Sequence, residues 1–168
     1  APRVKNDADG KQFWVVDDDL QLGPVGYCVI RADGSKALGT TTLSRVDEMH
    51  PGATDPQARL QVMDAQGISK QILYPNVLGF AGSFVMNIRD VPLRNFCVQA
   101  YNEHAAGMQQ GTAGRLLPQA LLPIWDMELT IQEVIRCHEH YGLTGLVLTD
   151  SPELWQLPTL SESYWDPL

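Results

Sequence analysis

The stretch YGLTGLVLTD, residues 141–150, decides the fold class. A helical pattern ends at Gly142, a short apolar segment follows, and the chain becomes polar again at Thr149 and Asp150. Residues 66–76, QGISKQILYPN, repeat this order of glycine, apolar segment and polar end. A left-handed glycine commonly ends a helix, and a short apolar segment bounded by polar residues is typical of a buried strand. The two stretches therefore predict repeated helix–strand units.

Working outward, three helices are predicted, each followed by a strand. The first helix begins at Asp55 and Pro56, because aspartate accepts hydrogen bonds from the free amides of a first turn and proline has no N–H to leave unpaired there. Gly67 is predicted to end this helix in the left-handed conformation. The strands are expected at residues 70–76, 115–126 and 145–150.

Residues 91–108 form the clearest helical pattern. Mostly apolar residues recur there every three or four positions, which places them on one face of a helix. That face is predicted to comprise Leu93, Phe96, Cys97, Ala100, Tyr101, His104, Ala105 and Met108.

The third helix is expected to begin at Met127 or Ile131 and to end at Tyr141. Two caps are possible for it: the side chain of Asp126, or a capping box made by Thr130 and Glu133. Its inward-facing side chains are predicted to be Ile131, Val134, Ile135 and His138.

Helices and strands that alternate at this length predict parallel strands joined by right-handed crossovers. The apolar segments are continuous, so the strands are expected to be covered on both faces. Residues 55–168 are therefore interpreted as an α/β unit whose polar strand ends meet at one edge, where such folds place their sites. Residues 1–54 are expected to form an irregular β-hairpin unit. Its strands are predicted at residues 3–5 and 12–16, around the turn DADG, with a short strand near residues 27–30.

Composition narrows the class of protein. The chain has 168 residues, a net charge of -8 and 44% hydrophobic residues. This acidic balance argues against nucleic acid and anionic membranes as partners. Three well-separated cysteines favour reduced thiols, and neither a signal peptide nor a membrane span is evident, so a cytoplasmic location is expected. No nucleotide-binding or serine hydrolase motif is present.

Five phrases then occur in register with one known family: DEMHPGATDPQARLQVMDAQGISKQILYPN, LRNFCVQAYNEHAAG, GRLLPQALLPIWDMELTIQEV, YGLTGLVLTDSPE and YWDPL. Over residues 45–168 the chain resembles the amidohydrolase-related proteins, in the branch of aminocarboxymuconate-semialdehyde decarboxylase and related metal-dependent hydrolases. Residues 1–54 resemble an insertion that some members carry after the first barrel strand. The resemblance implies a (β/α)8 TIM barrel with a divalent metal, usually zinc, at the carboxyl ends of its strands.

The family's metal ligands have no counterpart in this sequence. The resemblance assigns them to a His-x-His pair on the first strand, a histidine on the fifth and an aspartate on the eighth. The three predicted strands correspond to about strands two to four, so the first strand is expected before Ala1 and the fifth after Leu168. A complete barrel needs about 250 residues. We therefore expect the chain to be a central part of a larger enzyme and to hold no metal by itself.

Candidate residues for substrate binding lie in loops and at strand ends. His50 lies in a loop before the first helix, where it either contacts substrate or fixes a turn. Trp125 either stacks on a flat substrate or plugs the barrel, and Asp150 either contacts substrate or holds a loop. The full set comprises His50, Tyr74, Asn76, Trp125 and Asp150.

The remaining histidines and the cysteines are assigned structural positions. His104 is expected in the core, His138 partly buried and His140 in solvent. Positions two apart on a helix point in nearly opposite directions, so His138 and His140 cannot hold one metal together. No cysteine has an identifiable base, and no catalytic residue is assigned.

The resemblance implies an enzyme that hydrolyses or nonoxidatively decarboxylates a small carboxylate substrate. The alternative is a noncatalytic fragment, or an assembly or binding module, with an open parallel sheet. In either case we expect the chain to associate with copies of itself or with the remainder of a barrel. A small doubly wound binding domain is a weaker alternative, because it leaves the five phrases unexplained.

Overall fold

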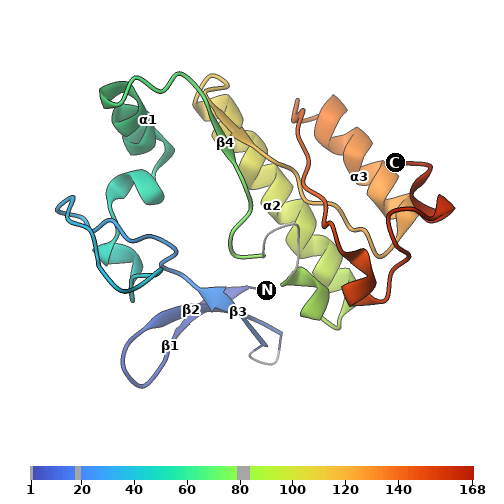
Figure 1. Cartoon of the computed structure of the whole chain (residues 1–168), viewed down its shortest axis with the longest axis horizontal. Coiled ribbons are helices and arrows are strands. Elements are labelled where there is room, and N and C mark those ends of the chain that lie inside the picture. The colour runs from blue at the N-terminus through green and yellow to red at the C-terminus, as the bar shows by residue number, and fades with distance from the viewer. Residues whose placement is uncertain (1, 18–19, 79–83) are drawn as a thin grey trace.

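The computed structural model describes residues 2–17, 20–78 and 84–168 of the chain (Figure 1). Within these residues the α-helices are α1 (Pro56–Ala65), α2 (Val91–Gly111) and α3 (Met127–Glu139). The strands are β1 (Arg3–Asn6), β2 (Gln12–Val16), β3 (Leu20–Pro24), β4 (Gln71–Leu73) and β5 (Leu116–Pro118). Short 3-10 helices span Val46–Glu48, Pro51–Ala53, Val85–Asn87, Pro152–Trp155 and Ser163–Trp165.

The strands that separate the helices are parallel, as the sequence predicted. Ile72 of β4 pairs with Leu117 of β5, and Ala120 forms a single parallel bridge with Leu146. β4 and the segment around residues 144–150 run in the opposite direction to α2 and α3 (Figure 1). This arrangement places the carboxyl ends of the strands beside the amino-terminal ends of the two long helices.

The predicted strands are longer than the observed ones. β4 and β5 each have three residues, and the third predicted strand makes only the bridge at Leu146. Prolines explain part of this difference, since Pro75, Pro118 and Pro123 have no N–H to donate to a ladder.

The prediction that both faces of the strands are covered is wrong within the described residues. The Ile72 side chain is 56% exposed and that of Tyr74 is 55% exposed, while Leu116 of the neighbouring strand is fully buried. α2 packs against β5. The helices therefore cover one side of the parallel strands and leave the other side open.

Local chemistry sets the helix ends as predicted. Asp55 Oδ1 accepts a hydrogen bond from Gln57 N at 2.8 Å, and Asp126 Oδ1 accepts one from Leu129 N at 3.1 Å. Gly67 and Gly142 follow α1 and α3 with φ of 69° and 66°.

The alternative capping box at the start of α3 is wrong. The Thr130 side chain is buried and its hydroxyl donates to Pro123 O at 2.9 Å and to Asp126 O at 2.8 Å. The carboxylate of Glu133 is engaged with other side chains, described below. Asp126 alone therefore provides the side-chain cap.

The inward face of α2 differs from the predicted stripe. Phe96, Ala100 and His104 are exposed, so their assignment to the core is wrong. The buried residues are Cys97, Val98, Asn102, Ala105 and Ala106. The buried face is rotated by about one position because α2 packs on both β5 and α3, and because it includes a polar residue that apolar periodicity does not select.

The same kind of error occurs in α3. Ile135 and His138 were predicted to face inward and both are exposed. The buried residues are instead Thr130, Glu133 and Cys137. His140 is exposed, as predicted.

The amino-terminal residues form a three-stranded antiparallel sheet in the order β1-β2-β3. The hairpin β1–β2 agrees with the prediction, and the Asp7 carboxylate stabilises its turn by accepting from Asp9 N and Lys11 N at 3.0 and 2.9 Å. β3 was not predicted, because its sequence LQLGP has no clear alternation. The strand expected near residues 27–30 is reduced to isolated bridges such as Ile30–Lys36.

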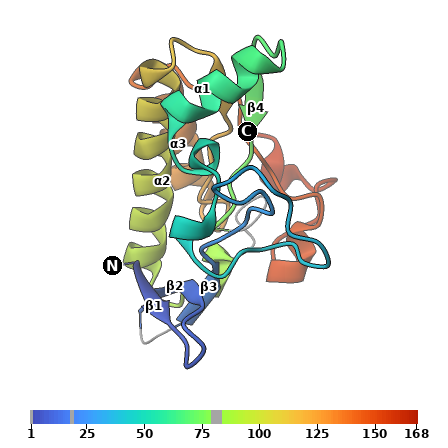
Figure 2. The same cartoon turned by 90° about the vertical axis from the view of Figure 1, so that its left-hand side faces the viewer.

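This three-stranded sheet lies near the carboxyl ends of the parallel strands and the amino-terminal end of α2 (Figures 1 and 2). Val16 and Leu22 belong to one hydrophobic cluster with Val98 of α2 and Val147 of the last parallel segment. Trp14 and Trp125 pack against the same cluster. None of the described helices has both the length and the apolarity needed to cross a bilayer.

Candidate functional site

Three of the predicted site residues follow the parallel strands at the edge where α/β folds place their sites. Tyr74 and Asn76 follow β4, and Asp150 ends the segment that bridges to Ala120. Tyr74, Asn76 and Asp150 are all exposed. The Asp150 carboxylate accepts a hydrogen bond from the Ser151 hydroxyl at 3.2 Å.

Trp125 lies just before α3 and is held on two sides. Its Nε1 donates to Asn95 Oδ1 at 3.0 Å, and the guanidinium carbon of Arg94 lies 4.9 Å from its ring centroid. Arg94 is anchored in turn, because Nε and Nη2 donate to Ile88 O at 2.8 and 2.6 Å. Partial burial lowers the pKa of Arg94 from its ordinary value. One face of the indole is therefore covered by Arg94.

His50 lies in a different environment, between two 3-10 helices. Its Nδ1 accepts a hydrogen bond from Gly52 N at 3.1 Å, which leaves the proton of the neutral ring on Nε2. Arg59 Nη1 donates to Gly52 O at 3.1 Å, and Arg59 Nε donates to Gln71 Oε1 at 2.8 Å. These contacts tie the His50 turn to the first residue of β4, whereas Tyr74 follows the last.

The structure does not assemble a catalytic pair from the predicted residues. Within the described parts of the chain, no hydrogen bond, ion pair or ring contact joins any two of His50, Asn76, Trp125 and Asp150. Their grouping at the strand ends remains a prediction from topology.

The described residues also do not fit a metal centre. In residues 2–17, 20–78 and 84–168, no group of three or more His, Cys, Asp or Glu side chains is placed to hold an ion. His104, the predicted core histidine, is exposed on α2, and His138 and His140 are exposed on α3. A metal of the kind the family resemblance implies would need ligands from elsewhere.

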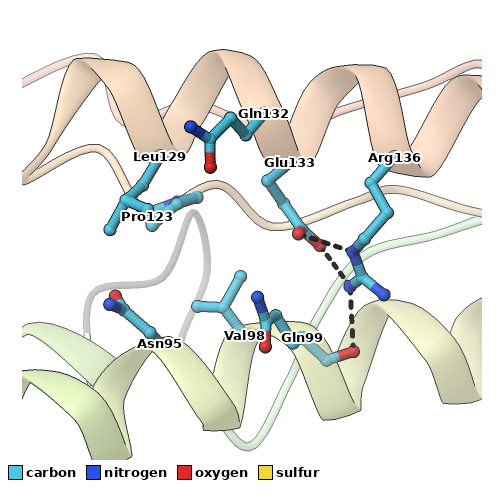
Figure 3. A pocket seen from close by; sticks show the side chains of 8 residues that line it. All are labelled: Asn95, Val98, Gln99, Pro123, Leu129, Gln132, Glu133 and Arg136. Atoms are coloured by element: carbon cyan, nitrogen blue, oxygen red, sulfur yellow. Dashed lines mark hydrogen bonds and ion pairs between the residues drawn. The ribbon is translucent and has the colours of Figure 1, made fainter.

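A second feature lies between two helices and was not predicted. A cavity of about 130 Å³ opens between α2 and α3 (Figure 3). We refer to it as the α2–α3 groove. Its lining residues are Asn95, Val98, Gln99, Pro123, Leu129, Gln132, Glu133 and Arg136.

One end of the α2–α3 groove is built on a buried carboxylate. Glu133 is only 4% exposed, and its Oε1 accepts from Asn102 Nδ2 and from Arg136 Nη2, both at 2.6 Å. Arg136 Nε donates to Glu133 Oε2 at 2.8 Å, and Nη1 donates to the Tyr141 hydroxyl at 2.7 Å. The hydrogen bonds from Arg136 to Glu133 raise the pKa of the guanidinium. The pair is therefore charged on both sides and neutral overall.

Asn102 connects this carboxylate to the backbone that follows β5. Its Nδ2 donates to Leu121 O and its Oδ1 accepts from Leu121 N, both at 2.9 Å. Burial, with the nearby Glu133 carboxylate, raises the pKa of the Cys137 thiol to about 12. Asn102, Glu133 and Arg136 thus fix α2, α3 and residue 121 relative to one another.

The sequence contained a signal for these residues. Glu133 and Arg136 are three positions apart, a spacing that pairs side chains on one helix face. Asn102 follows Val98 by four positions, which places it on the buried face of α2. Glu133 was instead considered as a cap, and Asn102 was overlooked because it is polar.

Solved structures of two related enzymes are similar to this fold. The chain is 27% identical to 2,6-dihydroxybenzoate decarboxylase, in one structure from Rhizobium and in another complexed with 2,6-dihydroxybenzoate. Each match has a TM-score of 0.51 and covers 65% of this chain and 33% of the other. The resemblance to the amidohydrolase-related family is confirmed.

A third amidohydrolase-related structure matches over a smaller region. It is a dihydroxybenzoic acid decarboxylase from Polaromonas sp. JS666, with bound manganese and the inhibitor 2-nitroresorcinol. The identity is 28%, the TM-score is 0.47, and the match covers 54% of this chain and 26% of the other. Neither a protein-family profile nor a curated protein sequence matches the chain.

The amidohydrolase-related structures confirm the fold class only at a coarse level. The mixed α/β architecture agrees with a TIM-barrel relative. The chain spans about a third of the length of the two 2,6-dihydroxybenzoate decarboxylases, and the assignment of its strands as the second to fourth remains a prediction.

Proposed function

We propose that this chain is part of a metal-dependent decarboxylase of the amidohydrolase-related family, acting on a small aromatic carboxylate. The observation that carries the proposal is the 27% identity to 2,6-dihydroxybenzoate decarboxylase over 65% of the chain. The sequence left hydrolysis and decarboxylation open, and this similarity favours decarboxylation. The reaction is nonoxidative: the carbon–carbon bond to the carboxylate breaks, CO₂ leaves, and a proton replaces it on the ring.

In this proposal the chain supplies about strands two to four of the barrel, preceded by the insertion of residues 1–54. The hydrogen bonding of β4 supports an incomplete sheet. Gln71 N donates to Arg115 O and Gln119 N donates to Leu73 O. Alternate residues of a parallel strand face opposite neighbours, so the peptide groups of Ile72 face away from β5. β4 can therefore accept another strand on that side.

The divalent metal, zinc by the family resemblance, would be held by residues outside this chain. That part of the proposal is supported by the absence of a suitable ligand group among the described residues. A bound metal would supply a positive charge next to the substrate carboxylate.

The contribution of this chain would be part of the pocket wall. The exposed ring of Tyr74 is suited to pack on a flat substrate, and the amides of Asn76 can hydrogen-bond to its hydroxyls. His50 can donate from Nε2 through its fixed tautomer. Trp125 and Asp150 complete the proposed set, and none of the five is assigned a proton-transfer role.

The test is an assay of the protein encoded by the whole reading frame. It should be incubated with 2,6-dihydroxybenzoate and either manganese or zinc, and the formation of 1,3-dihydroxybenzene and CO₂ followed by chromatography and gas analysis. We expect decarboxylation that stops on chelation of the metal, and none with the 168-residue chain alone. Hydrolysis of amide or lactone substrates without CO₂ release would contradict the proposal, as would turnover by the isolated chain.

One observation favours the alternative of a noncatalytic assembly module with an open parallel sheet. Ile72 and Tyr74 expose more than half of their side chains on the uncovered face of β4. If the native protein ends within this sequence, that face is expected to bind another strand. Intact mass of the native protein distinguishes the cases, because a product of 18.6 kDa would support the module.

A further inference from the structure

The α2–α3 groove is too small for a substrate or cofactor but large enough for a side chain. Its volume of about 130 Å³ is well below the roughly 300–1,000 Å³ of a typical small-molecule pocket. Pits of side-chain size with an apolar floor are typical of protein interfaces, where a partner's aromatic anchor fills them. The size of the groove therefore points to a partner protein.

The chemistry of the groove suits an uncharged anchor. Val98, Pro123 and Leu129 provide apolar lining. The charges of Glu133 and Arg136 neutralise each other through two hydrogen bonds, at 2.6 and 2.8 Å. A charged side chain would gain no counter-ion in this groove, whereas an aromatic ring would bury apolar surface.

The rim of the α2–α3 groove consists of carboxamides (Figure 3). Asn95 Oδ1 is occupied by Trp125 Nε1, which leaves its Nδ2 protons available. Gln132 Nε2 donates to Glu128 at 3.3 Å, which leaves its Oε1 available as an acceptor. With Gln99, the rim offers both donors and acceptors and adds no net charge.

Exposed apolar side chains lie on either side of this rim. Phe96, next to Asn95 on α2, is 54% exposed, and Ile135, one turn after Gln132 on α3, is 48% exposed. The same surface therefore carries both a pit and a large aromatic side chain. A surface that pairs with itself across a two-fold axis needs this combination, because each copy must supply the residue that fills the other.

We infer that the α2–α3 groove is a homodimer interface in which Phe96 of each copy fills the groove of the other. The uncharged groove and rim are where two copies, each with a net charge of -8, can approach most closely. Glu103 and Glu128, one turn from Gln99 and Gln132, would face like charges at the edge of the interface. Salt screens such repulsion, so dimerisation should strengthen as ionic strength rises.

The test is the oligomeric state of the 168-residue chain, measured by light scattering and sedimentation across a dilution series. The unmodified chain should have twice the 18.6 kDa mass of one copy at high concentration. Phe96→Ser, which removes the aromatic anchor, should raise the dimer dissociation constant about thirtyfold or more. Gln132→Arg, on the opposite helix, should do the same by placing a charge at the rim.

The matched control is Ile72→Ser, which removes an equally exposed apolar side chain from β4. We expect this variant to dimerise like the unmodified chain. The inference is overturned if the unmodified chain stays monomeric throughout the series, if the dimer survives both groove substitutions, or if Ile72→Ser disrupts it instead. Circular dichroism of each variant shows whether a lost dimer reflects a lost fold.

Discussion

Glu133 shows how one buried charge organises two helices. A carboxylate taken out of water is costly unless charged and polar partners surround it. Here the partners are Asn102, at 2.6 Å, and the guanidinium of Arg136, at 2.6 and 2.8 Å. No described buried side-chain nitrogen or oxygen lacks a hydrogen-bond partner, so the network is complete.

Removing Arg136 should therefore destabilise the fold. Arg136→Ala leaves Glu133 buried with only its Asn102 bond and a thiol contact. Because Arg136 is 27% exposed, we expect a loss of about 2 kcal/mol, between the values for surface and buried pairs. Urea denaturation measures it. Arg45→Ala, which breaks an exposed pair with Asp47, should leave the midpoint unchanged, and equal effects of the two variants would contradict this reading.

Two buried acids should make the fold sensitive to alkali. Burial raises the pKa of Tyr101 from 10.0 to about 12 and that of Cys137 from 9.0 to about 12. The folded chain keeps both protons while the unfolded chain loses them, so the stabilisation is complete below pH 9 and is lost as pH rises towards 12.

The free energy of unfolding, measured by urea titration at successive pH values, should fall steeply over this range. The double variant Tyr101→Phe/Cys137→Ala should show a shallower fall, whatever its stability at neutral pH. A parallel pH dependence in the two proteins would show that other groups are responsible.

At the scale of elements, the sequence predicted what neighbouring residues determine. The caps at Asp55 and Asp126, the helix ends at Gly67 and Gly142, and the first hairpin each depend on a few adjacent positions. The buried face of α2 depends on which elements pack around it, and that information is not local. Phe96 fits the apolar period and is nevertheless exposed.

Glycine positions give a direct test of the helix ends. Gly67 has a φ of 69°, where a Cβ is strained, so Gly67→Ala should destabilise the fold by about 1 kcal/mol. Gly107 lies within α2 with open space around its Cβ position, so Gly107→Ala should stabilise by about 0.5–1 kcal/mol. Thermal melts of the two variants should shift in opposite directions, and a shared direction would refute the assigned backbone roles.

At the scale of the whole molecule, the candidate site could be predicted only as an edge. Topology placed Tyr74, Asn76 and Asp150 after parallel strands, and the structure contains two parallel pairings that agree with it. Which side chains would face a substrate depends on strands and loops that these residues do not provide. The Asn102–Glu133–Arg136 network was missed because its purpose is visible only once α2 and α3 are packed together.

The whole-molecule proposal makes a prediction about metal content. The 168-residue chain, dialysed after exposure to zinc or manganese, should retain no stoichiometric metal by elemental analysis, because no described group can ligate it. Phe96→Ser serves as a control for metal trapped between associated copies. Retention of one ion per chain would place the ligands within this sequence.

The shared cluster around Val16 and Leu22 has a practical consequence for work on shorter versions of this chain. These two side chains pack with Leu78, Val98 and Val147, which come from three later segments. A clone that starts at residue 55 would expose those three side chains to solvent. Such a product should aggregate in expression cultures, whereas clones that keep the amino-terminal sheet should yield dissolved protein.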